Sequence, residues 1–373
     1  MSGHSNLSSF TKNLFRHALG SGSRHIKRIT NKSDVTFIVE KNNWSIKMDG
    51  LQIQQALIES KLSINFKLSG RPYLSNSKVY HFGSQYMWES WENKLFKKEK
   101  VALTFFHGKK TDSFLANRNI EYLIRNQHKL SKVIVSFSEM ENRMTSWGID
   151  PSKIIKIPIG VDLNQFKPVT SEESRAKLQK QYNLPNGYKF LGSFQKDGEG
   201  WGQGSNPKLI KGPDLLVESL LEINKKVPIF VILSGPSRGY VINRLSELKI
   251  PYIHVYFEDF RKIAELYKLL DLYLVTSREE GGPKGLIESL ASGCPVVTTP
   301  VGMSSDLKLD DKVSLRVDDF EVEKIVKSAI TILEQQISSI QRQELREIVS
   351  GLSWDEIAML HYNKIYKPIL ESF

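Results

Sequence analysis

The sequence predicts an α/β protein built from two doubly wound, Rossmann-like domains. Short β-rich runs alternate with segments of helical spacing, which is the pattern of a parallel sheet with helices between its strands. The alternation stops near residues 160–168 and then begins again. A chain of 373 residues is also too long for one ordinary core and fits two domains of usual size. Ligands of such folds bind at the carboxyl ends of the strands, so we expect a cleft between the domains.

The first domain is expected at residues 34–165, after a flexible basic tail at 1–33. This tail is rich in Ser, Asn, Lys and Arg, and its one short amphipathic segment, 10–19, predicts a basic helix that touches a membrane surface. The elements that follow are expected, in chain order, as a strand at 34–39, a helix at 51–60, strands at 78–83 and 101–108, a helix at 117–130, a strand at 132–138, and a last strand within 148–168.

The second domain is expected at residues 166–353. Its predicted strands are 188–194, 229–235, 252–257, 271–277 and 295–300, and its predicted helices are 211–224, 238–249, 260–270 and 283–292. The last segment of the chain, 354–373, has a helical pattern. We expect this C-terminal helix to pack back on the first domain.

Composition and charge narrow the class of protein. No run approaches 18 apolar residues and no signal peptide is evident, so a cytoplasmic protein is expected, peripheral at the inner face of the membrane. The single cysteine, Cys294, rules out an internal disulfide. Residues 1–166 carry 25 Lys and Arg against 13 Asp and Glu (net +12), whereas residues 167–373 carry 27 against 28 (net −1). A basic first half predicts an anionic partner, and a surface that only aids solubility is the alternative.

The candidate catalytic and ligand-binding residues are concentrated in one stretch, residues 278–297, REEGGPKGLIESLASGCPVV. It places Glu280 on a loop after a buried strand and Glu288 in the helix that follows, which is expected to start near Pro283. Gly281 and Gly282 let backbone approach a ligand, and free N–H groups at the helix start suit a diphosphate. Spacing alone leaves three alternatives open: an acid–base pair, two carboxylates that bind sugar hydroxyls, and exposed surface charges.

The motif EGGPKGLIE, with SLASGCPVVTTPVG after it, resembles the donor site of retaining glycosyltransferases with the GT-B fold, glycosyltransferase family 4. The resemblance extends over most of the chain from about residue 34 and includes SFSEMENRMTSWGIDPSKIIKIPIGVDLNQFKP, KGPDLLVESL and FRKIAELYKLLDLYLVTSREEGGP. It implies that Glu280 binds the donated sugar, that Glu288 binds the ribose and that Lys211 neutralises the diphosphate. The donor site it implies comprises Lys196, Lys208, Lys211, Glu280, Gly281, Gly282, Pro283, Lys284, Gly285, Leu286 and Glu288.

The resemblance also implies functional residues outside this motif. His107 matches a strand-end histidine that contacts the donor or the reaction centre, so His107, Lys211 and Glu280 are the candidate catalytic residues. Asp49 and Gly50 lie where the family has a glycine-rich acceptor loop. Ser193 stands where the family has an arginine, and Lys196 or Lys208 is the expected substitute. Family 4 enzymes generally need no metal or other cofactor, and no metal-ligand spacing is present.

The leading hypothesis is therefore a retaining glycosyltransferase that moves a sugar from a nucleotide-diphosphate-sugar to a hydroxyl acceptor. A glycan or lipid-linked acceptor in surface polysaccharide or glycolipid biosynthesis would explain the basic first half. A sugar-nucleotide epimerase or hydrolase of the same fold is one alternative. A non-enzymatic basic protein that binds nucleic acid is the other, although no nucleic-acid-binding module is evident and nucleic acid is not the expected partner.

Overall fold

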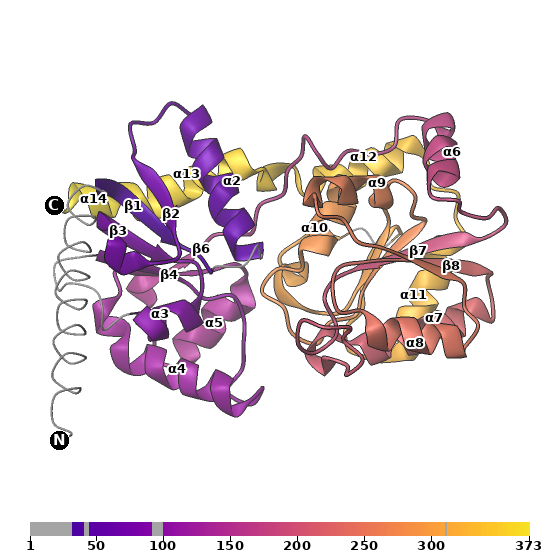
Figure 1. Ribbon diagram of the computed structural model, residues 1–373, viewed down its shortest axis with the longest axis horizontal. Helices are drawn as coiled ribbons and strands as arrows, with labels where there is room; N and C mark the ends of the chain where they lie inside the picture. Colours follow the sequence, from indigo (N-terminus) through magenta and orange to yellow (C-terminus); the bar gives the residue numbers. More distant parts are fainter. Residues whose placement is uncertain (1–31, 41–44, 92–99, 310–311) are drawn as a thin grey trace, which may run out of the picture.

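The computed structural model describes residues 32–40, 45–91, 100–309 and 312–373. The basic helix expected at 10–19 lies outside these residues. The predicted fold class is confirmed: the described chain forms two six-stranded sheets, each with helices on both faces (Figure 1). All strand pairs in both sheets are parallel.

The first sheet has the strand order β2-β1-β3-β4-β5-β6. Helix α2 lies on one face with the C-terminal helices, and α3, α4 and α5 lie on the other (Figure 1). The strands are β1 (Lys32–Ile38), β2 (Phe66–Ser69), β3 (Asn76–Phe82), β4 (Lys100–Thr104), β5 (Lys132–Val135) and β6 (Ile154–Lys156). The helices are α2 (Ser45–Glu59), α3 (Gln85–Trp91), α4 (Phe114–Asn126) and α5 (Ser138–Ser146).

The second sheet has the order β12-β11-β10-β7-β8-β9. Its central strands are buried on both faces, as parallel sheets require, and β8 is buried at every position. The strands are β7 (Lys189–Phe194), β8 (Ile229–Ser234), β9 (Tyr252–Val255), β10 (Leu272–Val275), β11 (Val296–Thr298) and β12 (Ser314–Arg316). The helices are α6 (Glu172–Gln181), α7 (Pro213–Asn224), α8 (Gly239–Glu247), α9 (Ile263–Tyr267), α10 (Lys284–Ala291), α11 (Val322–Leu333) and α12 (Ser339–Glu347).

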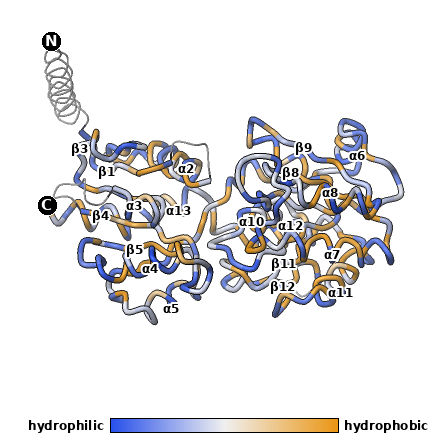
Figure 2. Tube along the Cα trace, turned by 60° about the horizontal axis from the view of Figure 1, so that its bottom comes forward, coloured by the Kyte–Doolittle hydropathy of each residue, from blue (hydrophilic) through white to orange (hydrophobic). Residues whose placement is uncertain are grey.

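The chain crosses between the two halves twice, and the two crossings bind each other. Val161, in the first crossing, donates its N–H to Leu352 O over 2.8 Å in the second. Gly160 lies against Trp354, and a Cβ at this glycine would lie 2.6 Å from the indole ring. Apolar packing continues across this region, because one core cluster contains Phe137, Val161 and Met303. Figure 2 shows the two halves side by side, each with hydrophobic segments along its chain. The two halves are therefore joined by packing as well as by the chain.

The C-terminal segment packs on the first sheet. It forms α13 (Trp354–His361), one π-helical turn (Tyr362–Tyr366) and α14 (Lys367–Glu371). Tyr366 Oη lies 2.8 Å from Nδ1 of His81, whose Nε2 lies 2.8 Å from Oγ1 of Thr104. His81 is therefore a structural residue: it is fully buried and ties the C-terminal segment to the sheet.

His361 makes the stability of this packing depend on pH. Its ring lies against those of His81 and Tyr366, and burial lowers its pKa to about 4. The imidazole is thus neutral in the folded protein, whereas in the unfolded chain it takes up a proton below about pH 6.5. Because the unfolded state binds more protons at this residue in this range, the contribution of His361 to stability is greatest above pH 6.5 and declines as the pH falls toward 4.

We predict that His361→Phe removes part of this acid sensitivity. The linkage relation gives a loss of about 2 kcal/mol for the wild-type residue on going from pH 7.5 to pH 5, and phenylalanine does not titrate. Urea unfolding at both pH values measures the difference. The exposed His128, changed to Asn, is the control and should leave the wild-type pH dependence in place. An unchanged pH dependence in His361→Phe would contradict the assignment.

Candidate functional site

The loop between β10 and α10 carries the central acidic motif, and two contacts anchor it to the start of α7. Thr276 donates its hydroxyl to Gly212 O over 2.9 Å. Arg278 binds Asp214 through two hydrogen bonds of 2.8 and 2.6 Å, which is the strong bidentate geometry. Gly212 has a left-handed φ of 62°, and a Cβ there would lie 1.8 Å from Thr276 O. The glycine before α7 is thus required for the loop to lie this close.

Glu280 forms a nearly buried ion pair with Lys211. The carboxylate lies 2.6 Å from Lys211 Nζ and accepts a 2.9 Å hydrogen bond from the Ser277 hydroxyl. Burial alone would raise the pKa of Glu280, but the Lys211 ammonium and the hydrogen bonds from Lys211 and Ser277 hold it below its ordinary value. Glu280 is therefore ionised at neutral pH. The structure excludes the exposed-charge alternative for this residue, whose side chain is 12% exposed.

Lys211 lies at the end of a short 3-10 turn, Leu209–Lys211, and not within the predicted helix, which begins at Pro213. Its carbonyl accepts a 3.0 Å hydrogen bond from Gln195 Nε2, which ties the turn to the end of β7. Two more lysines lie in the same electrostatic environment. Burial lowers the pKa of Lys208, and the positive charges of Lys211 and Lys196 lower it further. Three mutually repelling ammonium groups form a site suited to a multivalent anion.

His107 comes to this site from the first sheet, as its strand-end position predicted. Burial lowers its pKa, so the imidazole is neutral at pH 7, although the Glu280 carboxylate acts in the opposite direction. Its Nδ1 is buried and has no hydrogen-bond partner among the residues that the structure describes. A buried nitrogen without a partner is costly and marks a position where a ligand group can bind. The structure therefore brings His107, Lys211 and Glu280 together.

Glu288 lies in α10, as predicted, and is bound by a residue that sequence reasoning missed. Tyr267 donates its hydroxyl to the carboxylate over 2.9 Å. Burial raises the pKa of Glu288, against the opposing effects of Lys284 and of the Tyr267 hydrogen bond. The predicted donor residue Lys284 instead forms an ion pair with Asp49 of the first domain.

Protein atoms lie against the glycines of the motif, where a ligand was expected. A Cβ at Gly281 would lie 2.5 Å from Phe106 O of the first domain, and one at Gly282 would lie 2.6 Å from Ile159. A Cβ at Gly285 would lie 2.2 Å from the Tyr273 hydroxyl. The first two glycines thus allow the two domains to approach each other, whereas the sequence had suggested a ligand at these positions. Pro283 precedes the first residue of α10, and Leu286 is a core residue with no exposed surface.

The predicted acceptor pair also needs correction. Asp49 and Gly50 lie within α2, which begins at Ser45, and not at the junction of loop and helix. A Cβ at Gly50 would lie 2.8 Å from the Phe37 ring, so this glycine serves helix packing. Asp49 is buried, and burial raises its pKa despite the pairing with Lys284. Asp49 thus belongs to the interface between the domains, whereas Gly50 does not face a cleft.

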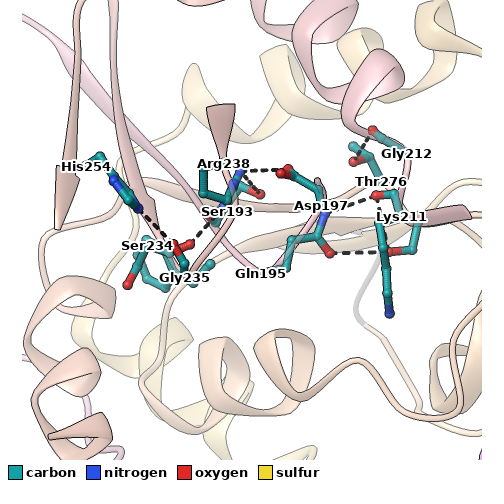
Figure 3. A network of polar contacts seen from close by, with 12 residues as sticks. Ser193, Gln195, Asp197, Lys211, Gly212, Ser234, Gly235, Arg238, His254 and Thr276 are labelled. Atoms are coloured by element: carbon teal, nitrogen blue, oxygen red, sulfur yellow. Dashed lines mark hydrogen bonds and ion pairs between the residues drawn. The ribbon is translucent and has the colours of Figure 1, made fainter. Parts of the chain in front are cut away.

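An arginine does lie beside Ser193, but it comes from another element. Arg238, at the start of α8, donates to Ser193 O over 2.5 Å and to Ser234 O over 2.9 Å, and it pairs with Asp197 at 3.0 Å (Figure 3). The side chains of Arg238 and Asp197 are fully buried. Lys211 points away from Arg238 (Figure 3). Arg238 therefore holds together the ends of β7 and β8 and cannot replace the expected ligand-binding arginine.

The glycine-rich segment between β7 and the Lys211 turn, residues 195–207 (the glycine-rich insertion), folds back over Arg238. Gln203 O and Gly204 O accept the N–H groups of Gly239 and Tyr240 at the start of α8, at 2.7 and 2.9 Å. The insertion also presents Trp201, which is 57% exposed, with Lys196 Nζ 3.7 Å from a ring centroid. Lys196 is thus held at the edge of the site by a cation–π contact.

Comparison with known proteins gives a family match for the second half. The model of the family described as glycosyl transferases group 1 matches residues 207–349. Among curated relatives, a D-inositol 3-phosphate glycosyltransferase of Xylanimonas cellulosilytica is 28% identical over 48% of this chain and 43% of its own length. The putative glycosyltransferase YtcC of Bacillus subtilis is 25% identical over 75% of this chain and 67% of its own length. This chain thus spans less than half of the first of these relatives.

Solved structures match over nearly the whole chain. A glycosyltransferase of Rickettsia africae superposes with a TM-score of 0.70 at 17% identity and covers 92% of this chain and 100% of its own. The Anabaena protein HepE in complex with UDP gives 0.67 at 12% identity, with coverage of 90% and 100%. At these identities the matches establish the fold, which is the GT-B arrangement of two Rossmann-like domains.

We predict that Arg238→Met strongly destabilises the second domain. Removing one partner of a buried ion pair typically costs about 3–5 kcal/mol, because the other charge is left buried without compensation. Arg244, in the same helix, pairs with Glu247 on the surface, so Arg244→Met should change stability by less than about 1 kcal/mol. Urea unfolding monitored by circular dichroism compares the two variants. Equal midpoints would show that the Arg238–Asp197 pair has no stabilising role.

Proposed function

We propose that this protein is a retaining glycosyltransferase that transfers a sugar from a nucleoside-diphosphate-sugar to a hydroxyl acceptor. The observation that carries the proposal is the convergence of the ionised Glu280, Lys211 and the neutral His107 at the ends of the two sheets. The family match over residues 207–349 supports it, as do relatives that are themselves named as glycosyltransferases.

The charges of the site suit the two ends of such a donor. Lys211 has three donor hydrogens, so it can keep its bond to Glu280 and still bind a phosphate oxygen. Lys196 and Lys208 add positive charge where a diphosphate would lie. Glu280 accepts hydrogen bonds from sugar hydroxyls. Glu288 accepts hydrogen bonds from the ribose hydroxyls, either in place of the hydrogen bond from the Tyr267 hydroxyl or in addition to it. We propose that these lysines hold the diphosphate.

In the proposed reaction the glycosidic C–O bond breaks and its electron pair leaves with the diphosphate, where the Lys211 ammonium stabilises the charge. The acceptor oxygen attacks the same face of the sugar, and its proton passes to the departing phosphate oxygen. No carboxylate base is needed for this step. Glu280 remains ionised, so it is a poor proton donor for an epimerase or hydrolase, and that alternative has less support. Product analysis with and without an acceptor separates these activities.

We predict that Lys211→Ala weakens the binding of a nucleoside diphosphate about 10- to 100-fold, the loss expected for one charge-assisted hydrogen bond. Lys225 lies at the other end of α7 and pairs with Glu222 on the surface, so Lys225→Ala is the matched control and should bind normally. Isothermal titration with UDP and GDP measures the affinities. Tight binding of an oligonucleotide in place of either nucleotide would favour the nucleic-acid-binding alternative.

We predict that Glu280→Gln separates binding from transfer. The variant frees Lys211 from its ion pair, so affinity for the free nucleoside diphosphate should be unchanged or higher. Transfer should fall about 100-fold or more, because a charged contact to the reacting sugar is lost. The donor is first identified by thermal shift with UDP-, GDP- and TDP-sugars, and product formation is then followed by mass spectrometry. Full transfer by this variant would overturn the role of Glu280.

We further propose an anionic or lipid-linked acceptor and docking to the inner membrane face, because the first half is basic. None of the helices in the described ranges is long and apolar enough to cross a membrane. We predict that the full chain sediments with vesicles that contain anionic lipid at low salt, and that binding weakens at moderate salt as charges are screened. Neutral vesicles are the control. A lack of sedimentation with anionic vesicles at low salt would refute docking.

A further inference from the structure

We infer that Glu279 is a positioning residue. It holds the loop that follows β4 and carries His107 (residues 105–109, the His107 loop) in place against the loop between β10 and α10 of the second domain. The inference rests on the proposed function, because His107 and Glu280 are the groups that it aligns. Glu279 immediately precedes Glu280, yet its carboxylate is directed to the other domain. Glu279 is 6% exposed, and it accepts hydrogen bonds or ion pairs from three donors of the first domain.

These donors surround the peptide that follows His107. Arg143 Nη1 lies 2.7 Å from the Glu279 carboxylate, Lys109 Nζ lies 3.2 Å from it, and the Gly108 N–H donates to it over a longer 3.4 Å. Arg143 also donates to Gly108 O over 3.0 Å. We call these four residues the Glu279 cluster. Both polar groups of Gly108 are thus bound within it, and Gly108 has a φ of 140°, which favours glycine.

The other side of the His107 loop is held by its own domain. Gln85 donates its side-chain amide to His107 O over 3.2 Å and accepts from Phe106 N–H at 3.4 Å. These contacts are long for hydrogen bonds, whereas the Arg143–Glu279 contact is short and charged. The shortest of these bonds to the loop is the one from Arg143 to Gly108 O at 3.0 Å, and Glu279 of the second domain holds the Arg143 guanidinium in place.

Burial explains why the cluster acts as a unit. A carboxylate that is nearly fully buried must be paired, and the partners of Glu279 all belong to the first domain, so these bonds form only when the two domains lie against each other. Its neighbour Glu280 pairs with Lys211 of its own domain. The consecutive loop residues Glu279 and Glu280 thus bind different domains. When the two domains come together, His107 is consequently aligned with Glu280 in the same step.

A second interdomain cluster offers a matched control. Asp306 of the second domain pairs with Lys156 at 2.9 Å and accepts from the Ser138 N–H and hydroxyl at 3.0 and 2.9 Å. It links the same two domains by the same kind of bond but has no contact with the His107 loop. A role limited to joining the domains predicts similar effects for Glu279→Gln and Asp306→Asn, whereas positioning predicts an effect on His107 from Glu279→Gln alone.

The test follows the histidine signal of His107 by NMR in the ligand-free full chain. Release of the loop into solvent raises the pKa of His107 toward its ordinary value, about 6.5. If the loop stays in place, loss of the nearby negative charge lowers that pKa further, because Glu279 acts to raise it. We expect a rise in Glu279→Gln and none in Asp306→Asn. Arg143→Lys keeps the charge but not the forked geometry, and should give an intermediate rise. Circular dichroism confirms that each variant is folded.

Steady-state kinetics are the second part of the test, after the NMR measurement. With the identified donor and acceptor, Glu279→Gln should lower kcat about tenfold or more with donor KM within twofold, and Asp306→Asn should change neither beyond twofold. A lower or unchanged pKa of His107 in Glu279→Gln, or equal effects of both variants, would overturn the inference. If the wild-type protein transfers no sugar, the proposed function fails, and the NMR arm still decides whether Glu279 positions His107.

Discussion

The arrangement of the site depends on two consecutive carboxylates, the buried Glu279 and the largely buried Glu280, which need cations on opposite sides of one loop. A buried carboxylate is stable only when it is paired and hydrogen-bonded. Glu280 satisfies this requirement with Lys211, which fixes the loop to the start of α7. Glu279 satisfies it with Arg143 and Lys109, which fixes the same loop to the first domain. The relative position of the domains is therefore set at the residues proposed to bind the donor.

The pairing of Glu279 with first-domain cations also changes how the positive charge of residues 1–166 is interpreted. Its excess of positive charge, net +12 over residues 1–166, suggested an external anionic partner. Part of that charge is directed inward, because Lys109 and Arg143 bind Glu279 and Lys156 binds Asp306. Only the remaining cations are available to an acceptor or a membrane surface.

Much of the fold could be predicted from the sequence because long buried elements have clear periodicity. The runs IFVIL at 229–233 and LYLV at 272–275 carry no charged side chain and are almost entirely apolar, which is how strands buried on both faces appear. Two of the unpredicted elements have weak patterns: β2 is a four-residue edge strand, and α6 has no buried residue. Helix α11, in contrast, has clear helical spacing with Ile325, Ala329 and Ile332 buried, and sequence reasoning missed it. The others that were not predicted are α3, α5, α12 and β12.

The site was predictable where its residues lie within one motif, and less so where they meet through the fold. Glu280 and Glu288 lie eight positions apart in the sequence, and both are half-buried and hydrogen-bonded, to Lys211 and Tyr267 respectively. The Glu279 cluster joins residues 136 and more positions apart, and no local pattern marks Arg143 as the partner of Glu279. Likewise, the pairing of Lys284 with Asp49 depends on how the domains meet.

Arg238 shows how a plausible substitution can be excluded by burial. Ser193 lacks the side chain that the resemblance implies, and Arg238 lies beside it in space. Its guanidinium is fully buried beneath the glycine-rich insertion and already binds two carbonyls and Asp197, so it has no surface to offer to a phosphate. Lys196, Lys208 and Lys211 lie on the outer side of this layer, where mutual repulsion lowers the pKa of Lys208, after the effect of burial. An anion that binds here would relieve that repulsion, which is the reason to place the diphosphate among the lysines and not at the arginine.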